Sequence, residues 1–342
     1  MRFALSDEQR QFGAVIRELL ADAGVPAAAR AWAGGDQAPG LAIWRELAKS
    51  GVTALAVPES CDGLGAHPVD LVVACEELGR HPVPGPVAES VAAVPQLLAA
   101  LAAAPVTGSR ARDWLAALAS GDLIATLASP PLLPRALDAD AAGLALLAAA
   151  GSVWLAAPGA RLESADRARR LFEVSPGQAL ASGPDAEAAV SRATGYGTLA
   201  SAALLLGAGR GLLEAAARHA KTREQFGRPV GSFQAVKHAL ADVLIGLEFA
   251  RPLLYAAAVA LGAGAPTTAR DISAARVACA DAARRAARTA LQVHGAVGYT
   301  LECDISLWLV KVRSLSSTWG SQAEHRAVVL RELAQDGAGA WS

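Results

Sequence analysis

Three long stretches in the second half of the chain constrain its fold more than any other feature. Residues 189–221, 233–262 and 267–294 are rich in Ala and Leu and contain few helix-breaking residues, so each predicts one long helix. A shorter helix is expected over residues 320–336. Because small side chains occur on several faces of these helices, the helix axes can approach closely, and a helical bundle is the expected arrangement.

The N-terminal part of the chain, residues 1–120, predicts a helical domain. Ser6 followed by Gln9 has the pattern of a capping box at the start of the first helix, which is expected to stop near Gly24 and Pro26. Further helices are expected over residues 41–50, 69–78 and 88–104.

The chain changes character near Gly121. Short apolar runs now alternate with Pro and Gly turn signals, which is typical of the strands of a small β-domain. Strands are expected over residues 123–127, 143–148, 153–156 and 171–174. The sequence therefore predicts a mostly α protein with a small β-domain, divided into residues 1–120, 121–187 and 188–342.

Composition and charge exclude several classes of protein. Hydrophobic residues make up 53% of the chain and charged residues 18%, which excludes a disordered chain. The net charge is −1 and no basic block is present, so no nucleic-acid partner is expected. Four widely spaced cysteines predict neither disulfides nor a metal site. The charged N-terminus is no signal peptide, and the apolar runs are shorter than the roughly 20 residues of a membrane span, so we expect a cytoplasmic protein.

The loop between the first two long helices carries a candidate phosphate site. Gly227 and Pro229 break the chain there, and Arg223 and Gln225 lie on the resulting hairpin beside Phe226. An arginine at a helix end can bind a phosphate through its planar guanidinium group, and a phenylalanine offers a flat apolar face. Taken alone, the segment also fits an ordinary interhelix loop.

A second segment, residues 292–302, follows the third long helix and contains Gly295, which can end a helix and let the backbone approach a ligand. Together with the Arg223 hairpin it resembles the acyl-CoA dehydrogenase family. The hairpin matches the family stretch R-x-Q/T-F-G…FQ…H, and the second segment matches Q-x-H-G-G-x-G-Y-T-x-E. The resemblance covers roughly residues 1–95 and 190–335. Its N-terminal matches lie at residues 44–47, 56–65 and 76–80.

The resemblance implies an N-terminal helical domain, a middle β-domain and a C-terminal four-helix bundle. Members of the family bind FAD and oxidise an acyl-CoA thioester to the 2,3-enoyl-CoA, and an electron-transfer flavoprotein is the implied partner of the assembled enzyme. A carboxylate removes the α-proton while the β-hydride moves to flavin N5. In the family, certain positions contact FAD across a subunit interface. These positions are filled here by Arg223, Gln225, Phe226, Phe233, Gln234, Gln292 and Gly295.

The residues that would serve the chain's own flavin and its own chemistry are missing. The middle region is shorter than in the family and lacks the T-E-P-x-x-G-S-D loop and the W-x-T-N-G strand. Trp319 stands at the usual position of the catalytic glutamate and Gly197 at the alternative position, so no catalytic residue is assigned. Indole offers only an N–H donor and is no base near neutral pH. Trp319 therefore either lines a substrate site or fills the space of a lost one. Ala296, in place of the second glycine of the family pair, is a milder departure.

Other titratable residues in these segments are expected to be structural. His238 and His294 lie on apolar helices, where a histidine is usually a satisfied core group. Glu76 and Glu77 are expected in interdomain or helix-end ion pairs, and Glu324 on a solvated helix face.

We hypothesise that the chain is a subunit of a paired acyl-CoA dehydrogenase and has lost its own base. It would complete the FAD site of a homologous catalytic subunit in a heterotetramer. The family includes such pairs in bacterial steroid side-chain catabolism, where the vacated half-site makes room for bulky acyl groups. Two alternatives stay open: a homo-oligomeric flavoprotein with a displaced base, as in fatty acid β-oxidation, and a flavin-free scaffold or regulatory protein on the same fold.

Overall fold

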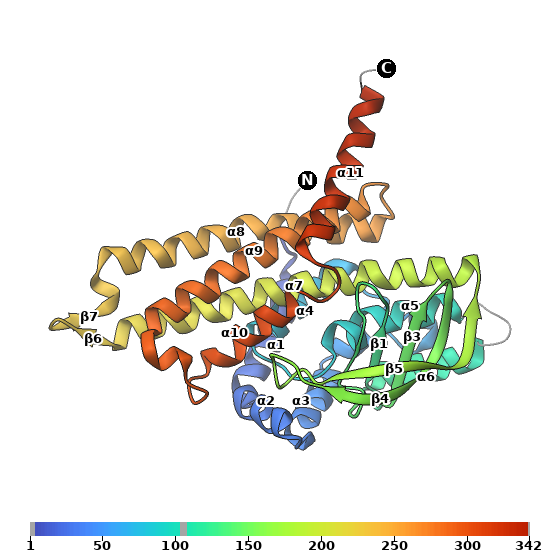
Figure 1. Ribbon diagram of the computed structural model, residues 1–342, viewed down its shortest axis with the longest axis horizontal. Coiled ribbons are helices and arrows are strands. Elements are labelled where there is room, and N and C mark those ends of the chain that lie inside the picture. Colours follow the sequence, from blue (N-terminus) through green and yellow to red (C-terminus); the bar gives the residue numbers. More distant parts are fainter. Residues whose placement is uncertain (1–3, 103–107, 341–342) are drawn as a thin grey trace.

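A long helical bundle forms one part of the molecule, and an N-terminal group of helices and a small sheet pack against it (Figure 1). The structure, a computed structural model, describes residues 4–102 and 108–340. In Figure 1 the N-terminal helices are blue to cyan, the sheet is green, and the bundle runs from yellow to red. This order confirms the predicted mostly α fold with a small β-domain, while the exact domain limits stay a prediction.

The N-terminal helices begin with the predicted capping box. The Ser6 hydroxyl accepts a hydrogen bond from the Gln9 amide, and the Gln9 side chain accepts one from the Ser6 amide, both at 3.1 Å. The helices predicted over residues 41–50 and 69–78 are confirmed as α3 and α4. The described helices of this part are α1 (Asp7–Asp22), α2 (Val25–Gly34), α3 (Ala38–Lys49), α4 (Pro68–Arg80), α5 (Val94–Leu101) and α6 (Gly108–Ser120).

Three features of this part differ from the prediction. The first helix ends at Asp22, close to Gly24 as predicted, but α2 follows at once and was not predicted; Pro26 lies in its first turn, where a proline loses no helical hydrogen bond. Helix α6 was not predicted as a separate element. The helix expected over residues 88–104 is divided into a π-helical turn at Glu89–Ala93 and α5, and residues 103 and 104 lie outside the described part.

The β-domain is a five-stranded sheet in the order β1-β3-β4-β5-β2. Strand β1 pairs with β3 in parallel, and the other pairs are antiparallel. All four predicted strands are confirmed, although β4 and β5 are longer than expected because they pair along most of their lengths through irregular registers. The strands are β1 (Ala125–Ala128), β2 (Ala136–Leu137), β3 (Leu144–Ala149), β4 (Ser152–Leu162) and β5 (Leu171–Ser182).

The bundle confirms the three long helices and the shorter terminal one. Helix α10 is not among the predicted helices, because it is short and apolar on most faces and so has little periodic signal. A two-stranded hairpin, β6 (Glu224–Gln225) and β7 (Arg228–Pro229), joins α7 to α8. The helices are α7 (Pro184–Thr222), α8 (Gln234–Ala263), α9 (Thr268–His294), α10 (Ile305–Leu315) and α11 (Gln322–Ala340).

Helices α4 and α7 cross with their backbones in contact. A Cβ atom added to Gly79 would lie 2.1 Å from the Leu204 carbonyl oxygen, and one added to Gly207 would lie 1.9 Å from the Glu76 carbonyl oxygen. These distances are far shorter than a van der Waals contact. Glycine is therefore required on both helices for the N-terminal group to reach the bundle.

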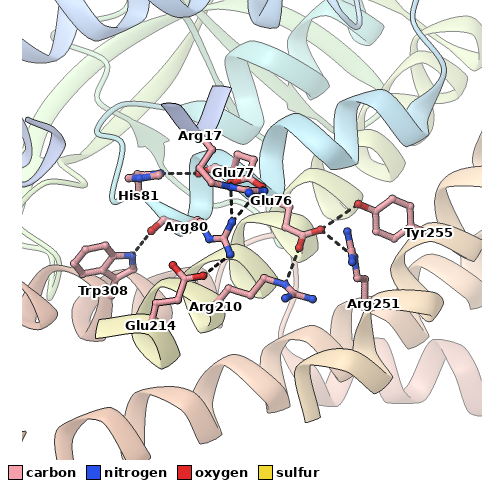
Figure 2. A network of polar contacts seen from close by, with 10 residues as sticks. All are labelled: Arg17, Glu76, Glu77, Arg80, His81, Arg210, Glu214, Arg251, Tyr255 and Trp308. Atoms are coloured by element: carbon pink, nitrogen blue, oxygen red, sulfur yellow. Dashed lines mark hydrogen bonds and ion pairs between the residues drawn. The ribbon is translucent and has the colours of Figure 1, made fainter. Parts of the chain in front are cut away.

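A buried polar network lies beside this crossing (Figure 2). Glu76 on α4 sits 2.8 Å from Arg210 Nε on α7, and the Tyr255 hydroxyl on α8 donates to it at 3.1 Å. Glu77 accepts a hydrogen bond from Arg17 Nε on α1 at 3.0 Å. The network joins four helices, which confirms the expected interdomain role of Glu76 and Glu77.

Two described helices, α7 and α8, are long and apolar enough to cross a bilayer by length and composition alone. Buried helices of soluble proteins pass the same test. The apolar window of α7 is 78% buried inside the fold, whereas that of α8 is 39% buried. Helix α7 is therefore a core helix, and α8 leaves part of its apolar surface uncovered.

Replacement of Glu76 by Gln is expected to destabilise the fold by about 3 kcal/mol, because two arginines would then lie beside a neutral amide in a buried site. Chemical unfolding measures the change in free energy. Glu46→Gln is the matched control, since the Glu46–Lys49 pair is exposed and should contribute less than about 1 kcal/mol. Equal effects of the two substitutions would contradict the expectation.

Candidate functional site

The hairpin end of the bundle brings several of the predicted site residues together. Gln225, Phe226, Phe233 and Gln292 line one open pocket of about 560 Å³. It is formed by the hairpin, the start of α8 and the end of α9. The rings of Phe226 and Phe233 meet edge to face with centroids 6.2 Å apart, and the Arg228 guanidinium lies 4.2 Å from the Phe233 ring centre. The pocket thus has a flat aromatic wall with a cation stacked on it.

The other three predicted cofactor residues lie around this pocket rather than on its lining. Arg223 ends α7, Gln234 is the first residue of α8, and Gly295 ends α9 with a φ of 61°. All three are exposed. The Arg223 side chain makes no hydrogen bond or ion pair with any described residue.

The hairpin side chains face away from their own chain. Phe226 leaves 92% of its surface exposed, an unusual state for a large aromatic residue, and its backbone holds a φ of 54°. Gln225 and Gln292 are also exposed. These exposed side chains are therefore accessible to a ligand or to another chain.

Arg288 is a member of this pocket that the sequence motifs did not identify. It lies one helical turn before Gln292 on α9 and lines the same pocket. Its guanidinium is exposed and makes no ion pair with a described carboxylate. The signal that could have found it is the spacing of four residues from Gln292, which places both side chains on one face of the helix.

Two histidines stack at the base of the hairpin end. The rings of His219 on α7 and His294 on α9 have centroids 4.2 Å apart and planes 23° apart. His294 Nδ1 is 2.8 Å from the Ala290 carbonyl oxygen, as expected for a satisfied histidine. Partial burial lowers the pKa of His219, and the neighbouring His294 lowers it further.

Trp319 and Gly197, the two positions at which a catalytic glutamate is expected, face each other. Trp319 is 1% exposed and follows α10, whereas Gly197 lies on α7. A Cβ atom added to Gly197 would lie 2.4 Å from the indole Cη2 atom. The indole ring therefore occupies the space directly over Gly197, and a glutamate has no room there while Trp319 is present.

The loop that carries Trp319 is held from several sides. The guanidinium of Arg276 donates to the Leu315 and Thr318 carbonyl oxygens at 2.5 and 2.9 Å. His325 Nε2 lies 2.8 Å from the Trp319 carbonyl oxygen, and the Gly320 amide donates to the carbonyl oxygen of residue 132 in the β-domain at 3.3 Å. Trp319 itself has a φ of 57°, which these contacts maintain. The indole is thus fixed in place.

Glu89 is the buried carboxyl group beside Trp319, and the sequence motifs did not indicate it. It lies in the π-helical turn before α5 and is 1% exposed. Burial raises its pKa, while the charge of Arg169 and the nearby Trp319 indole lower it less, and Asp138 adds a further rise. Because a catalytic base must reach its substrate, a carboxyl group sealed in the core does not replace the missing glutamate.

The described residues contain no group of three His, Cys, Asp or Glu side chains placed to hold a metal ion. The four cysteines are free thiols, and burial raises the pKa of Cys75 and of Cys279 to about 12.

Comparison with known proteins adds the family. Residues 6–122 match the family model described as "Acyl-CoA dehydrogenase, N-terminal domain", and residues 188–334 match "Acyl-CoA dehydrogenase, C-terminal domain". The chain is 31% identical over 330 residues to the acyl-CoA dehydrogenase IpdE2 of Mycobacterium tuberculosis, with 96% of each chain covered.

Two solved structures are similar over almost the full length. A variant of the Tcur3481-Tcur3483 steroid ACAD has a TM-score of 0.83 and 25% identity, covering 97% of this chain and 99% of that one. The ChsE4-ChsE5 complex of Mycobacterium tuberculosis has a TM-score of 0.78 and 24% identity, covering 98% of this chain and 99% of that one. Both show the fold.

The contact of Trp319 with Gly197 predicts a coupled pair of substitutions. Gly197→Ala should destabilise the protein by about 1–3 kcal/mol through the clash with the indole, and this penalty should disappear in a Trp319→Ala background. Gly195→Ala on the same helix is the control, since its Cβ would meet ordinary contacts at 3.7 Å and should be neutral or slightly stabilising. Additive effects of the two substitutions in a double-mutant cycle of unfolding would contradict the contact.

The burial of Glu89 predicts a pH-dependent effect. Because its pKa is raised in the folded state, the ionised form is disfavoured there, and Glu89→Gln should raise Tm at neutral pH. The difference should shrink as the pH falls and vanish below 4.5, the ordinary pKa of the unfolded state, because the carboxyl group is then protonated in both states. The exposed Glu8→Gln serves as control. A Glu89→Gln variant less stable than the wild type at neutral pH would show that the attraction of Arg169 outweighs burial.

Proposed function

We infer the function of this chain from its family: the chain belongs to the acyl-CoA dehydrogenase family in both its N-terminal and C-terminal parts. The family is one of FAD-dependent oxidoreductases that act on acyl-CoA thioesters. We propose that this chain is a non-catalytic subunit of such an enzyme. It completes the FAD site of a homologous catalytic subunit instead of running the reaction itself.

One observation carries the proposal: the chain keeps outward-facing binding groups and has filled its own reaction centre. Arg223 and Gln225 are exposed and their side chains make no hydrogen bond or ion pair with described residues, and Phe226 is 92% exposed with an edge contact to Phe233. Trp319 lies packed on Gly197 where a base and a substrate would otherwise meet. A homo-oligomer of this chain would have many FAD contacts and no base. A different subunit that supplies the base would make use of both features.

The outer surface of α8 supports association with a second subunit. Ile245 is 52% exposed and Phe249 is 76% exposed, and Leu244 and Leu253 lie on the same helix with nearly half of their surfaces exposed. Apolar groups gathered on one helix in this way are typical of a protein–protein interface. Phe226 at the hairpin extends the exposed apolar groups to the candidate flavin contacts.

The similar proteins support both pairing and a bulky substrate. One similar structure is the Tcur3481-Tcur3483 steroid ACAD, which carries the names of two proteins. Another is the complex of ChsE4 with ChsE5. We propose by analogy a steroid-derived acyl-CoA as substrate and a heterotetramer in the cytoplasm as the assembly. An electron-transfer flavoprotein would take the electrons from the shared FAD. Because Trp319 fills the half-site of this chain, the open half-site would lie in the partner subunit.

The proposal is tested by co-expression of the chain with a homologous flavoprotein subunit from the same organism. We expect a defined complex that contains FAD and oxidises an acyl-CoA, while the chain alone lacks both properties. Flavin absorbance, subunit ratio and dehydrogenase activity are the measurements. Activity and bound FAD in the chain alone would favour the homo-oligomer with a displaced base. A complex without flavin would favour the scaffold role.

In the complex, Arg223→Ala should weaken FAD retention by about tenfold or more, because a charge-assisted contact to a phosphate is lost. Arg218→Ala, one turn earlier on the same helix and also exposed, is the matched control and should leave retention unchanged. The FAD remaining after dialysis gives the comparison. Equal retention by both variants would remove the shared FAD site from consideration.

A further inference from the structure

Arg169 is a buried cation without an acidic partner. It lies in the loop between β4 and β5 and is 6% exposed, and its Nη1 donates to the Thr318 hydroxyl at 3.2 Å. No carboxylate oxygen of the described residues lies within 4.0 Å of its guanidinium. The adjacent Arg170 is different, since Asp138 and Asp140 each pair with it at 3.1 Å. Buried charges are normally paired, so an anion bound beside Arg169 would supply the partner that it lacks.

The free guanidinium nitrogens of Arg169 still reach solvent. Nε and Nη2 of Arg169 make no hydrogen bond to described residues, and neither atom is fully buried. Arg169 lines two pockets, one of about 390 Å³ and one of about 510 Å³. Both volumes are within the range of small-ligand sites.

Further arginines surround Arg169 in both pockets. Arg135 and Arg313 line the first pocket, and Arg161 and Arg167 line the second. All four are exposed and make no ion pair with a described carboxylate. The rim of each pocket is therefore positive.

Acidic groups do not cancel this charge. Glu163 lines both pockets and faces three arginines in the first. Glu89 couples electrostatically to Arg169, but burial raises the pKa of Glu89 and so disfavours its negative form. Each pocket keeps an excess of positive charge that an anionic ligand would balance.

The first pocket also offers hydroxyl groups beside its arginines. The hydroxyls of Ser164 and Ser314 line this space, whereas those of Ser317 and Thr318 already donate to the Ser314 carbonyl oxygen at 3.0 and 2.8 Å. The combination of guanidinium forks and hydroxyl donors suits the several oxygen atoms of a phosphate group.

We propose that the pocket of Arg169, Arg135 and Arg313 binds a phosphate-bearing ligand, with Arg169 at the buried end and the other two at the rim. The residues that line this site do not overlap with those of the hairpin pocket, and all of them lie in this chain. The inference therefore does not depend on the pairing role. The ligand would occupy the space on the outer side of the Trp319 loop, next to the region in which the family's flavin motifs are missing.

Isothermal titration of the full chain, alone or in its purified complex, with inorganic pyrophosphate tests the proposal. We expect saturable binding that weakens as salt is added and weakens at least tenfold in Arg169→Gln. Arg331→Gln, an exposed arginine on α11, is the matched control and should bind as the wild type does. Absence of saturable binding in the wild type, or equal binding by Arg169→Gln, would overturn the proposal.

A second variant covers the case in which Arg169→Gln fails to fold. Arg135→Gln combined with Arg313→Gln changes only exposed side chains, so its melting temperature should match the wild type. Its binding of pyrophosphate should be about tenfold weaker. Unchanged binding by this folded double variant would equally reject the site.

Two further titrations distinguish the sources of the phosphate. Tighter binding of coenzyme A than of ADP and pyrophosphate would identify the CoA moiety as the ligand. Equal binding of all three would identify a site for the phosphate group itself. In either case the Arg169→Gln variant should lose the same factor, since the contact is to phosphate oxygens.

Discussion

The direct contact between the backbones of α4 and α7 is the constraint on which the rest of the molecule depends. Gly79 and Gly207 allow the two helices to touch, and that approach places Glu76 beside Arg210 in a site with little water. The ion pairs are satisfied only because the crossing sets their separation. The same crossing fixes where the N-terminal helices meet the bundle, and with them the Glu89 turn that packs near Trp319.

Two parts of α7 differ in their exposure. At its C-terminal end the helix places Arg223 at the start of a solvent-exposed hairpin, beside a pocket lined by aromatic and amide side chains. In its middle, Gly197 receives an indole ring and is closed. One rigid helix therefore joins an open binding surface to a blocked centre. A subunit that serves a neighbour needs only the first of these to stay intact.

Local signals allowed much of the fold to be predicted from sequence. The capping box of Ser6 and Gln9 depends on residues three apart, and the long helices follow from their own composition. Features that depend on tertiary contacts could not be read in this way. Helix α2 begins directly after the predicted stop at Gly24, Glu89 meets Trp319 only through packing, and Arg288 reaches the hairpin pocket from a position on α9 four residues before the matched motif. The lack of a carboxylate beside Arg169 likewise depends on tertiary packing.

The indole over Gly197 also limits which single substitutions can place a carboxylate at this site. A glutamate restored at position 197 meets the ring at once, so this reversal requires a second substitution at the same time. A glutamate restored at Trp319 would bring a second carboxyl group into a buried space that already holds Glu89, and like charges there oppose each other. Each single step back lowers stability before it returns any activity. Two coordinated substitutions are therefore needed to place a carboxylate at position 197.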